Sequence, residues 1–374
     1  MSGIDSLYVS YSGNLSETRA EQLESLKTLA QSSIAAENAL AALALNDHLF
    51  EVRDRGKGRF PYLLADNWFH VQVSGLNASR LPLAYVQLSS EVLTRAGWVA
   101  ALSYLNKVLD ALQPQDQEPT ISRVDLCTDF TTSVHLDALP AYSWVTRSKR
   151  RSRHYIDDRF TGLTFGQGGD LSCRLYDKTE ELKKSRKTYL YPVWQAKGWD
   201  GVMPVWRLEF QFRRSVLREL GIESPEDLAL HTADLWVYAV SQWLRLAIPN
   251  HNDATRARWP THGLWELLLS AEWDWDPGEP LSRIRKARLP DDHYLFFNGI
   301  SGITSYMASK GIEDFYDGLK GFITDAVAYH RLIGIETGEN LQDYALAKAR
   351  EKARRYNTLI NPREGSDDGT EGRA

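Results

Sequence analysis

Cysteine is nearly absent from this sequence, and histidine is present without the spacing of a metal site. Two cysteines in 374 residues are too few for a disulfide framework or a cysteine-based zinc cluster. Because cysteine is among the most buried residue types, we expect Cys127 and Cys173 to be buried, reduced thiols. None of the nine histidines forms a His-x-His pair or an HExxH motif. The absence of both motifs argues against the class of nucleases that hold a metal with a histidine pair.

Long apolar runs are absent as well. No stretch approaches the roughly 18 apolar residues that a membrane-spanning helix needs, so we expect no membrane partner. The N-terminal residues MSGIDSLYVSYSG lack the charged start and apolar run of a signal peptide, and we therefore expect a cytoplasmic protein.

A net positive charge is missing from the chain as a whole. The formal net charge is −5, which by itself argues weakly against a nucleic-acid partner. The distribution points the other way. Residues 121–220 hold 18 Lys and Arg against 12 Asp and Glu, a net charge of +6, so the rest of the chain carries −11. A phosphate backbone meets a local patch and not an average, so the middle of the chain is a candidate for binding a polyanion.

The first part of the chain is rich in strand patterns. Alternating segments such as Ser6–Ser12 and Leu83–Leu88 predict strands. Ser16 is a helix cap, and Trp98–Leu112 has helical spacing. This mixture is typical of an α+β fold with a largely antiparallel sheet. We expect this candidate catalytic domain to occupy residues 1–222.

The rest of the chain has the pattern of helices. Ser224, followed by Pro225 and two acidic residues, is a helix start, and helical spacing recurs as far as Tyr356. We expect a mostly helical C-terminal region over residues 223–361. Residues 362–374 are polar and contain glycine, which predicts a disordered tail.

Three alternating segments between residues 121 and 212 are polar on one face and apolar on the other. Successive side chains of a strand point to opposite faces, so the polar residues of each segment share a face. They are Arg123, Asp125, Cys127 and Asp129 in the first segment, Arg174, Tyr176 and Lys178 in the second, and Arg207, Glu209 and Gln211 in the third. One explanation is that these are solvated outer faces held by cross-strand ion pairs. The other is that the three strands are neighbours and form one site.

The residue types on these faces suit chemistry on a phosphate. The carboxylates of Asp125, Asp129 and Glu209 are hard oxygen ligands, which suit Mg²⁺ or Mn²⁺, and a bound metal can polarise a phosphodiester. Tyr176 is a poor nucleophile at an ordinary tyrosine pKa of about 10. Neighbouring cations would favour its phenolate and neutralise charge in the transition state. The cations beside it are Arg174 and Lys178.

Further cations flank this candidate site. The segment Arg147–Arg153 (RSKRRSR) has five cations in seven residues, which indicates either a solvated loop or a non-specific phosphate contact. The GQGG sequence at 166–169 could cradle a phosphate with its amides, although a plain hairpin turn has the same pattern. Under the binding interpretation, the candidate DNA-binding residues are Arg147, Lys149, Arg150, Arg151, Arg153, Lys183, Lys184 and Arg207.

Three stretches together resemble a known family. They are RVDLCTDF (Arg123–Phe130), FGQGGDLSCRLYDKTEE (Phe165–Glu181) and VWRLEFQFRR (Val205–Arg214). In this order and spacing they resemble the replication initiation factor family, which comprises rolling-circle replication initiators of certain plasmids and phages and related relaxases of integrative conjugative elements. The RLYDK element followed by WRLE is the most specific part, and the resemblance covers roughly Leu7 to Leu220.

The resemblance implies an activity and a set of roles. Members of the family nick one strand at a double-strand origin, join a tyrosine to the 5′ phosphate and leave a 3′ hydroxyl. They use a divalent metal with acidic ligands and commonly act as homodimers. Carried over, the nucleophile is Tyr176 and the flanking cations are Arg174 and Lys178. The acidic positions of the family are matched here by Asp125, Asp129 and Glu209.

Two alternatives remain open at the level of sequence. The chain could be a catalytically inactive DNA-binding accessory of replication or transfer with the same fold. It could also be a metal-dependent hydrolase in which Tyr176 only orients the substrate. The net acidic charge and the lack of a clear DNA-recognition helix depart from the family. The partners expected from the resemblance are a DNA origin, in supercoiled or single-stranded form, and a host helicase.

Overall fold

The computed structural model describes residues 1–38, 40–46, 48–115, 117–185, 187–273, 292–337 and 340–356. The chain divides into two compact units, Met1–Arg283 and Ile284–Ala374. The boundary expected at residues 222 and 223 is therefore corrected, because residues 223–273 belong with the first unit. The tail expected over 362–374 lies outside the described residues.

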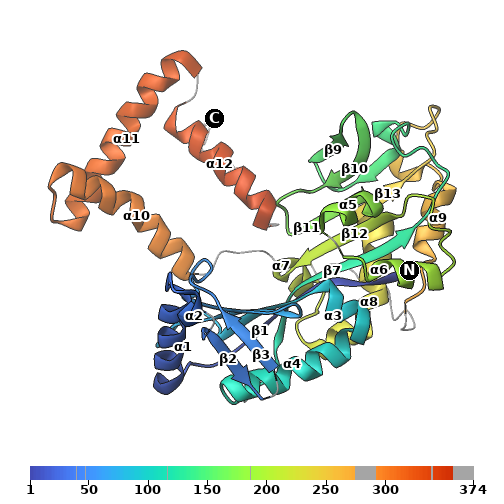
Figure 1. Ribbon diagram of the computed structural model, residues 1–374. Helices are drawn as coiled ribbons and strands as arrows, with labels where there is room; N and C mark the ends of the chain where they lie inside the picture. Colours follow the sequence, from blue (N-terminus) through green and yellow to red (C-terminus); the bar gives the residue numbers. More distant parts are fainter. Residues whose placement is uncertain are drawn as a thin grey trace. The chain divides into compact units, whose positions relative to one another are not determined.

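An eleven-stranded antiparallel sheet forms the centre of the first unit (Figure 1). Its strands follow the order β2-β3-β4-β5-β6-β1-β7-β12-β11-β10-β9. They are β1 (Ser2–Tyr11), β2 (Ala42–Leu45), β3 (His48–Val52), β4 (Tyr62–Ala65), β5 (Phe69–Val73), β6 (Ala84–Leu88), β7 (Thr120–Phe130), β9 (Arg151–Ile156), β10 (Arg159–Phe165), β11 (Leu171–Asp177) and β12 (Trp206–Arg213). The α+β class with an antiparallel sheet is therefore confirmed.

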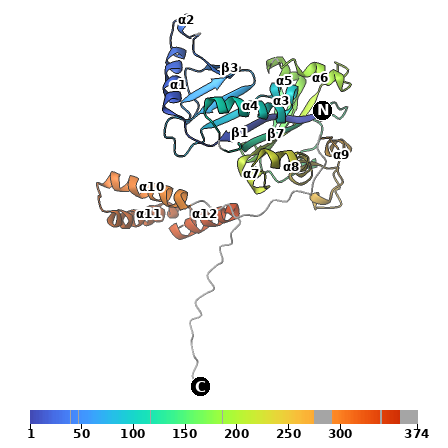
Figure 2. The ribbon, with the colours of Figure 1, turned by 90° about the horizontal axis from the view of Figure 1, so that it is seen from below.

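Helices cover both faces of this sheet. They are α1 (Glu17–Ala30), α2 (Ala35–Asn38), α3 (Ser90–Ala96), α4 (Trp98–Leu112), α5 (Lys178–Ser185), α6 (Leu190–Ala196), α7 (Arg214–Glu219), α8 (Pro225–Val237) and α9 (Gly263–Leu269). Figure 2 shows α7 and α8 on one side of β7, with α3, α5 and α6 on the other. The expected caps are present: Ser16 accepts a hydrogen bond from the amide of Arg19, and Ser224 forms a capping box with Asp227.

The apolar face of the central strands holds the core against α8. Leu126, Leu208 and Phe210 are fully buried, and the Phe210 ring meets the ring of Trp236 edge to face, with centroids 5.6 Å apart. After α8 the chain forms a π-helical turn (Tyr238–Trp243) and a short strand, β13 (Leu244–Leu246). That strand pairs with β8 (Trp144–Thr146). These contacts explain why the segment after residue 222 does not form a separate domain.

The basic segment Arg147–Arg153 is only partly a loop. Its end forms β9, which pairs with β10 in a hairpin at one edge of the sheet. The hairpin turn places Asp157 and Asp158 at φ of 46° and 60°, a left-handed conformation that aspartate tolerates. Alternation along β9 places Arg151 and Arg153 on the same face of the sheet, opposite the face of His154 and Tyr176, which share the register partner Gly162.

The described residues of the second unit form three helices. They are α10 (Asp292–Lys310), α11 (Phe315–Thr337) and α12 (Leu341–Tyr356), which agrees with the helical region expected here. A side chain at Gly318 would lie 2.3 Å from the Met307 side chain, so glycine allows α10 and α11 to approach closely. Asp325 also joins them, accepting a hydrogen bond of 2.9 Å from the hydroxyl of Tyr306. Within the described part of the chain, no helix is both long enough and apolar enough to span a membrane.

Candidate active site

The three polar strand faces form one continuous surface. Strands β7, β12 and β11 are direct neighbours in the sheet. In one row Tyr176 pairs with Arg207, which pairs with Asp129. In the next row Arg174 pairs with Glu209, which pairs with Cys127. Adjacency, which the sequence leaves as an assumption, is therefore confirmed by the sheet register.

This surface is not the solvated outer face of a half-buried sheet. The side chains of Asp125, Asp129, Arg207 and Glu209 are each at most 5 % exposed. Buried charges are tolerated only when they are paired and hydrogen-bonded. The polar face is therefore a built network of ion pairs.

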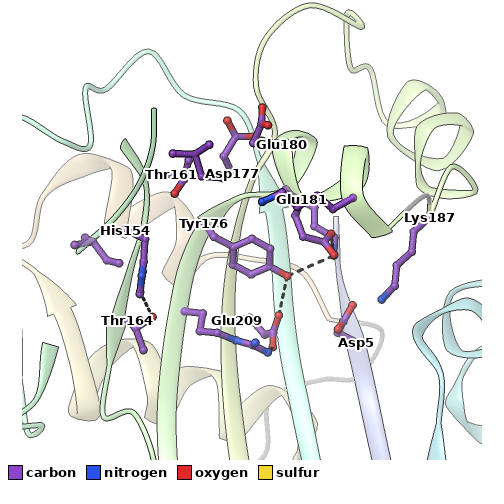
Figure 3. A pocket seen from close by; sticks show the side chains of 15 residues that line it. Asp5, His154, Thr161, Thr164, Tyr176, Asp177, Glu180, Glu181, Lys187 and Glu209 are labelled. Carbon is purple, nitrogen blue, oxygen red and sulfur yellow. Dashed lines mark hydrogen bonds and ion pairs between the residues drawn. The ribbon is translucent and has the colours of Figure 1, made fainter. Parts of the chain in front are cut away.

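A cavity of about 490 Å³ opens beside this network and is shown in Figure 3. Tyr176 and Glu209 point into it from the sheet, with Asp5 on one side and Lys187 beyond it. Strands β9 and β10 supply His154, Thr161 and Thr164, and α5 supplies Lys178, Glu180, Glu181 and Lys184. The cavity thus combines a phenol, carboxylates and several cations.

The hydroxyl of Tyr176 is held by an acid and a cation. It donates a hydrogen bond of 2.9 Å to Oε2 of Glu209 and accepts one of 3.4 Å from Nζ of Lys178. Oε1 of Glu209 accepts a hydrogen bond from Arg174, which orients the carboxylate. Burial, reinforced by the charge of Glu209, raises the pKa of Tyr176 well above its ordinary value, while Arg207 opposes that shift. The resting phenol is therefore neutral at physiological pH.

The backbone conformation around Tyr176 determines the positions of two neighbours, Lys178 and Gly162. Strand β11 ends at Asp177, and Lys178 is the first residue of α5. The expectation that Lys178 continues the strand is therefore wrong. Its side chain nevertheless lines the same cavity as Tyr176. It is only 2 % exposed and forms an ion pair of 2.7 Å with Glu181. Gly162 pairs directly with Tyr176. A Cβ there would lie 2.4 Å from the carbonyl oxygen of Leu175, so only glycine permits this pairing.

Asp125 and Asp129 are occupied by arginines and do not line the cavity. Both oxygens of Asp129 accept hydrogen bonds from Arg207, at 2.6 and 2.7 Å, and Oδ2 also accepts one from the indole of Trp194. Asp125 accepts two from Arg123. Burial raises the pKa of Asp125 to about 6, against the lowering effect of Arg123. These two acids hold the sheet face together.

Arg207 is also buried in the ion-pair network. It is 2 % exposed and lies between Asp129 and Asp5, with an ion pair to each. The expectation that Arg207 contacts DNA is therefore corrected, because no surface of its guanidinium is open to a phosphate.

Asp5 is a site residue that the sequence pattern did not predict. It lies in a bulge of β1 between Ile4 and Ser6, and the predicted strand began only at Ser6. Burial alone would raise the pKa of Asp5, but the charges of Arg207 and Lys178 outweigh it and hold that pKa below its ordinary value. The acidic residue in the segment GIDSLYV is a weak signal, because nothing in the pattern assigns it to a face.

The acids near Tyr176 suit a metal held by few protein ligands. Among the described residues, no group of three His, Cys, Asp or Glu side chains is placed to hold a metal ion. Asp5 and Glu209 nevertheless line the cavity around the Tyr176 hydroxyl. Mg²⁺ commonly takes one or two carboxylates and completes its shell with water and substrate phosphate. Asp5 and Glu209 could supply those carboxylates from the cavity wall, and a metal would share them with the arginines that already pair with them, Arg207 and Arg174.

The other predicted cations are distributed unevenly. Lys184 lines the cavity, as does Lys187, which was not predicted, and Lys183 forms an ion pair of 2.6 Å with Glu180. Arg151 and Arg153 pair with Phe165 and Leu163 on the apolar face. They donate to the carbonyl oxygens of Ala141, Asp137 and Leu139. The exposed cations that remain in the segment are Arg147, Lys149 and Arg150.

The glycines at 166–169 form the hairpin turn between β10 and β11 and do not line the cavity.

Comparisons with known proteins give only distant structural likenesses. No family model matches the chain, and no curated protein matches it. Among solved structures, the rolling circle replication initiator protein from Geobacillus stearothermophilus is similar at 14% sequence identity. The match covers 72% of this chain and 94% of that one, with a TM-score of 0.43. A likeness at this level assigns no function, so the functional argument rests on the residues themselves.

Proposed function

We propose that this chain nicks and rejoins one strand of DNA at an origin through a covalent 5′-phosphotyrosine on Tyr176. The observation that carries the proposal is the hydrogen bond from the Tyr176 hydroxyl to Glu209 inside an open cavity. Arg174 orients the acid, and Lys178 lies beside the phenol. A nucleophile, a proton acceptor and a group that orients the acceptor are the parts that covalent catalysis needs. The resemblance to rolling-circle initiators and relaxases supplies the substrate class.

The proposed reaction is a transesterification. The oxygen of Tyr176 attacks the phosphorus, and the bond from phosphorus to the 3′ oxygen breaks. The phenol proton passes to Glu209, the 5′ phosphate stays on Tyr176, and the 3′ oxygen takes a proton from water. Rejoining is the reverse attack by that 3′ hydroxyl. Because burial raises the pKa of Tyr176, free phenolate is scarce, and proton transfer to Glu209 accompanies the attack.

Cations around the phenol would stabilise the charge that develops on the phosphoryl oxygens. Arg174 and Lys178 flank the Tyr176 oxygen, and Lys184 and Lys187 line the same cavity. Positive groups that the protein holds in place stabilise a transition state more than mobile cations in bulk solvent do. Buried Lys178 is held by Glu181 and so keeps its position when the phosphate arrives.

A divalent metal, Mg²⁺ or Mn²⁺, is part of the proposal. Asp5 and Glu209 would hold it, with the remaining positions filled by water and a phosphate oxygen. When bound it supplies Lewis-acid polarisation of the phosphodiester. Asp125 and Asp129 would act through the ion-pair network.

The biological setting follows from the same resemblance. The substrate would be an origin in supercoiled or single-stranded DNA of a plasmid, a phage or a conjugative element. The enzyme would act as a homodimer and hand the nicked strand to a host helicase.

The direct test is to trap the covalent intermediate. The full chain is incubated with Mn²⁺ and supercoiled DNA of the replicon that encodes it, and the adduct peptide is identified by mass spectrometry. We expect a nucleotide on Tyr176, loss of adduct in Tyr176→Phe, and no loss in the matched control Tyr191→Phe. An adduct that persists undiminished in Tyr176→Phe would overturn the proposal. DNA binding without any adduct in the unaltered protein would favour the inactive accessory protein instead.

A further inference from the structure

A second cavity, of about 430 Å³, lies at the end of the same strands. Its walls are the loop 132–137, Arg159 at the start of β10, and the rings of Phe160 and Trp206. The two rings are stacked, with centroids 5.9 Å apart and an interplanar angle of 28°. Both side chains are only half-buried, so part of their aromatic surface is open to the cavity.

The stacked rings are fixed by their neighbours, and polar groups surround them. The ring of Tyr155 meets Phe160 edge to face at 5.8 Å, and the guanidinium of Arg153 lies 6.0 Å from the Phe160 ring centre. The loop side of the cavity presents the exposed polar side chains of Ser133, His135 and Asp137. An aromatic surface with hydrogen-bonding groups at its border suits a flat heterocycle that stacks and is contacted along its edge.

Two ion pairs of Arg159 connect this cavity to the candidate active site. Arg159, which lines it, forms ion pairs with Asp177 and Glu180, and both of these acids line the Tyr176 cavity. Trp206 pairs across the strands with Asp177, the residue after Tyr176. Tyr176 and Trp206 lie on opposite faces of the sheet, and the two cavities approach each other at the strand ends, where Arg159 pairs with Asp177. A polynucleotide held at Tyr176 would pass the half-exposed Arg159 to reach the aromatic rings.

We propose that the cavity bounded by Phe160, Trp206 and the loop 132–137 binds one unpaired nucleobase of the strand that Tyr176 attacks. We call it the base pocket. In a duplex both faces of each base are stacked and unavailable, so the ligand is single-stranded DNA. The inference rests on the proposed function for the identity of the strand, and it adds a contact that reads bases in addition to phosphates.

The test compares two probes of equal charge. One is a fluorescein-labelled oligothymidylate of 20 nucleotides, and the other is a 20-unit abasic deoxyribose phosphate strand. Binding is measured by anisotropy to the full chain carrying Tyr176→Phe, which forms no adduct. We expect about tenfold tighter binding of the oligothymidylate, equivalent to ~1.4 kcal/mol, as one base–aromatic stack provides. Adding Phe160→Leu, which keeps an apolar side chain but removes the aromatic face, should abolish most of this preference.

A matched control is Tyr142→Leu, which removes a half-exposed ring that contacts Trp259 away from the cavity; it should keep the full preference. Equal affinity for the two probes in the protein with an intact pocket would overturn the proposal, and this outcome does not depend on any substitution in the pocket. So would an unchanged preference in a Phe160→Leu protein with an unaltered melting temperature. Base preference without an adduct on Tyr176 in the unaltered chain would retain the base pocket and reject the nicking mechanism. An adduct without base preference would reject the base pocket alone.

Discussion

The hydroxyl of Tyr176 and the carboxylate of Glu209 lie on neighbouring strands in diagonal register and share a hydrogen bond of 2.9 Å. The strand partner of Glu209 is Arg174, and the strand partner of Tyr176 is Arg207. Each of the two groups therefore has a cation beside it. Among the described contacts, Glu209 is the only acid that accepts a hydrogen bond from the Tyr176 hydroxyl. This geometry favours Glu209 as a proton acceptor in addition to the metal-binding role expected from its residue type.

Replacing Glu209 with Gln should remove proton acceptance while keeping the size of the side chain. We expect single-turnover adduct formation to fall by about 10²- to 10⁴-fold, the usual contribution of a general base. The reaction is followed at saturating Mn²⁺, so that weaker metal binding does not limit the rate. Glu180→Gln, at the edge of the same cavity, should remain close to the unaltered protein. A Glu209→Gln rate equal to that of the unaltered protein would reject the assigned role.

Replacing Asp5 with Asn should weaken metal activation. We expect the Mn²⁺ concentration for half-maximal nicking to rise by about tenfold or more, because one of two carboxylate ligands is lost. Asp129→Asn is the contrasting variant. It should lower the free energy of unfolding by about 3–5 kcal/mol, since Arg207 would lose a buried partner. The folded fraction of Asp129→Asn should need the same Mn²⁺ concentration for half-maximal nicking as the unaltered protein. A higher Mn²⁺ requirement in Asp129→Asn and an unchanged one in Asp5→Asn would show that Asp129, and not Asp5, binds the metal.

The lysines that line the cavity should carry the salt dependence of DNA binding. Removing one phosphate contact lowers the slope of log affinity against log salt by about 1. We expect this change for Lys184→Ala and for Lys187→Ala, measured with single-stranded DNA between 50 and 200 mM salt. Arg53→Ala should leave the slope unchanged, because Arg53 pairs with Glu51 beside β3, near the far edge of the sheet. An unchanged slope in both lysine variants would show that these lysines do not lie along the phosphates.

Asp125 should make the protein less stable as the pH rises. Burial raises its pKa from 3.8 to about 6, so between these values the folded state binds more protons than the unfolded state. Its contribution to stability is therefore largest at low pH and is lost as the pH rises through about 6. Asp125→Asn removes this titration. We expect the difference in unfolding free energy between Asp125→Asn and the unaltered protein to shift in favour of the variant by ~1 kcal/mol from pH 5 to pH 8. Urea denaturation at both pH values measures it, and a shift of opposite sign would contradict the raised pKa.

Local pattern was sufficient for part of this structure. Alternation assigned Arg174 and Tyr176 to one face of a strand and Leu175 to the other, and the N-caps at Ser16 and Ser224 were read from residue type. The alternation of strands and the cap of a helix depend on neighbours a few residues apart. The α+β class followed from the same local signals.

Long-range contacts decided the remainder of the site. The position of Glu209 beside Tyr176 requires β11 and β12 to pair in one particular register, which no local pattern specifies. Burial turned Asp129 and Arg207 into a closed ion pair, although their residue types suited metal and DNA. Asp5 entered the cavity through a bulge in a strand far from Tyr176 in sequence. The sequence by itself thus determined which chemical groups each strand presents, whereas the tertiary structure decided which of them meet, because pairing and burial join residues that are distant along the chain.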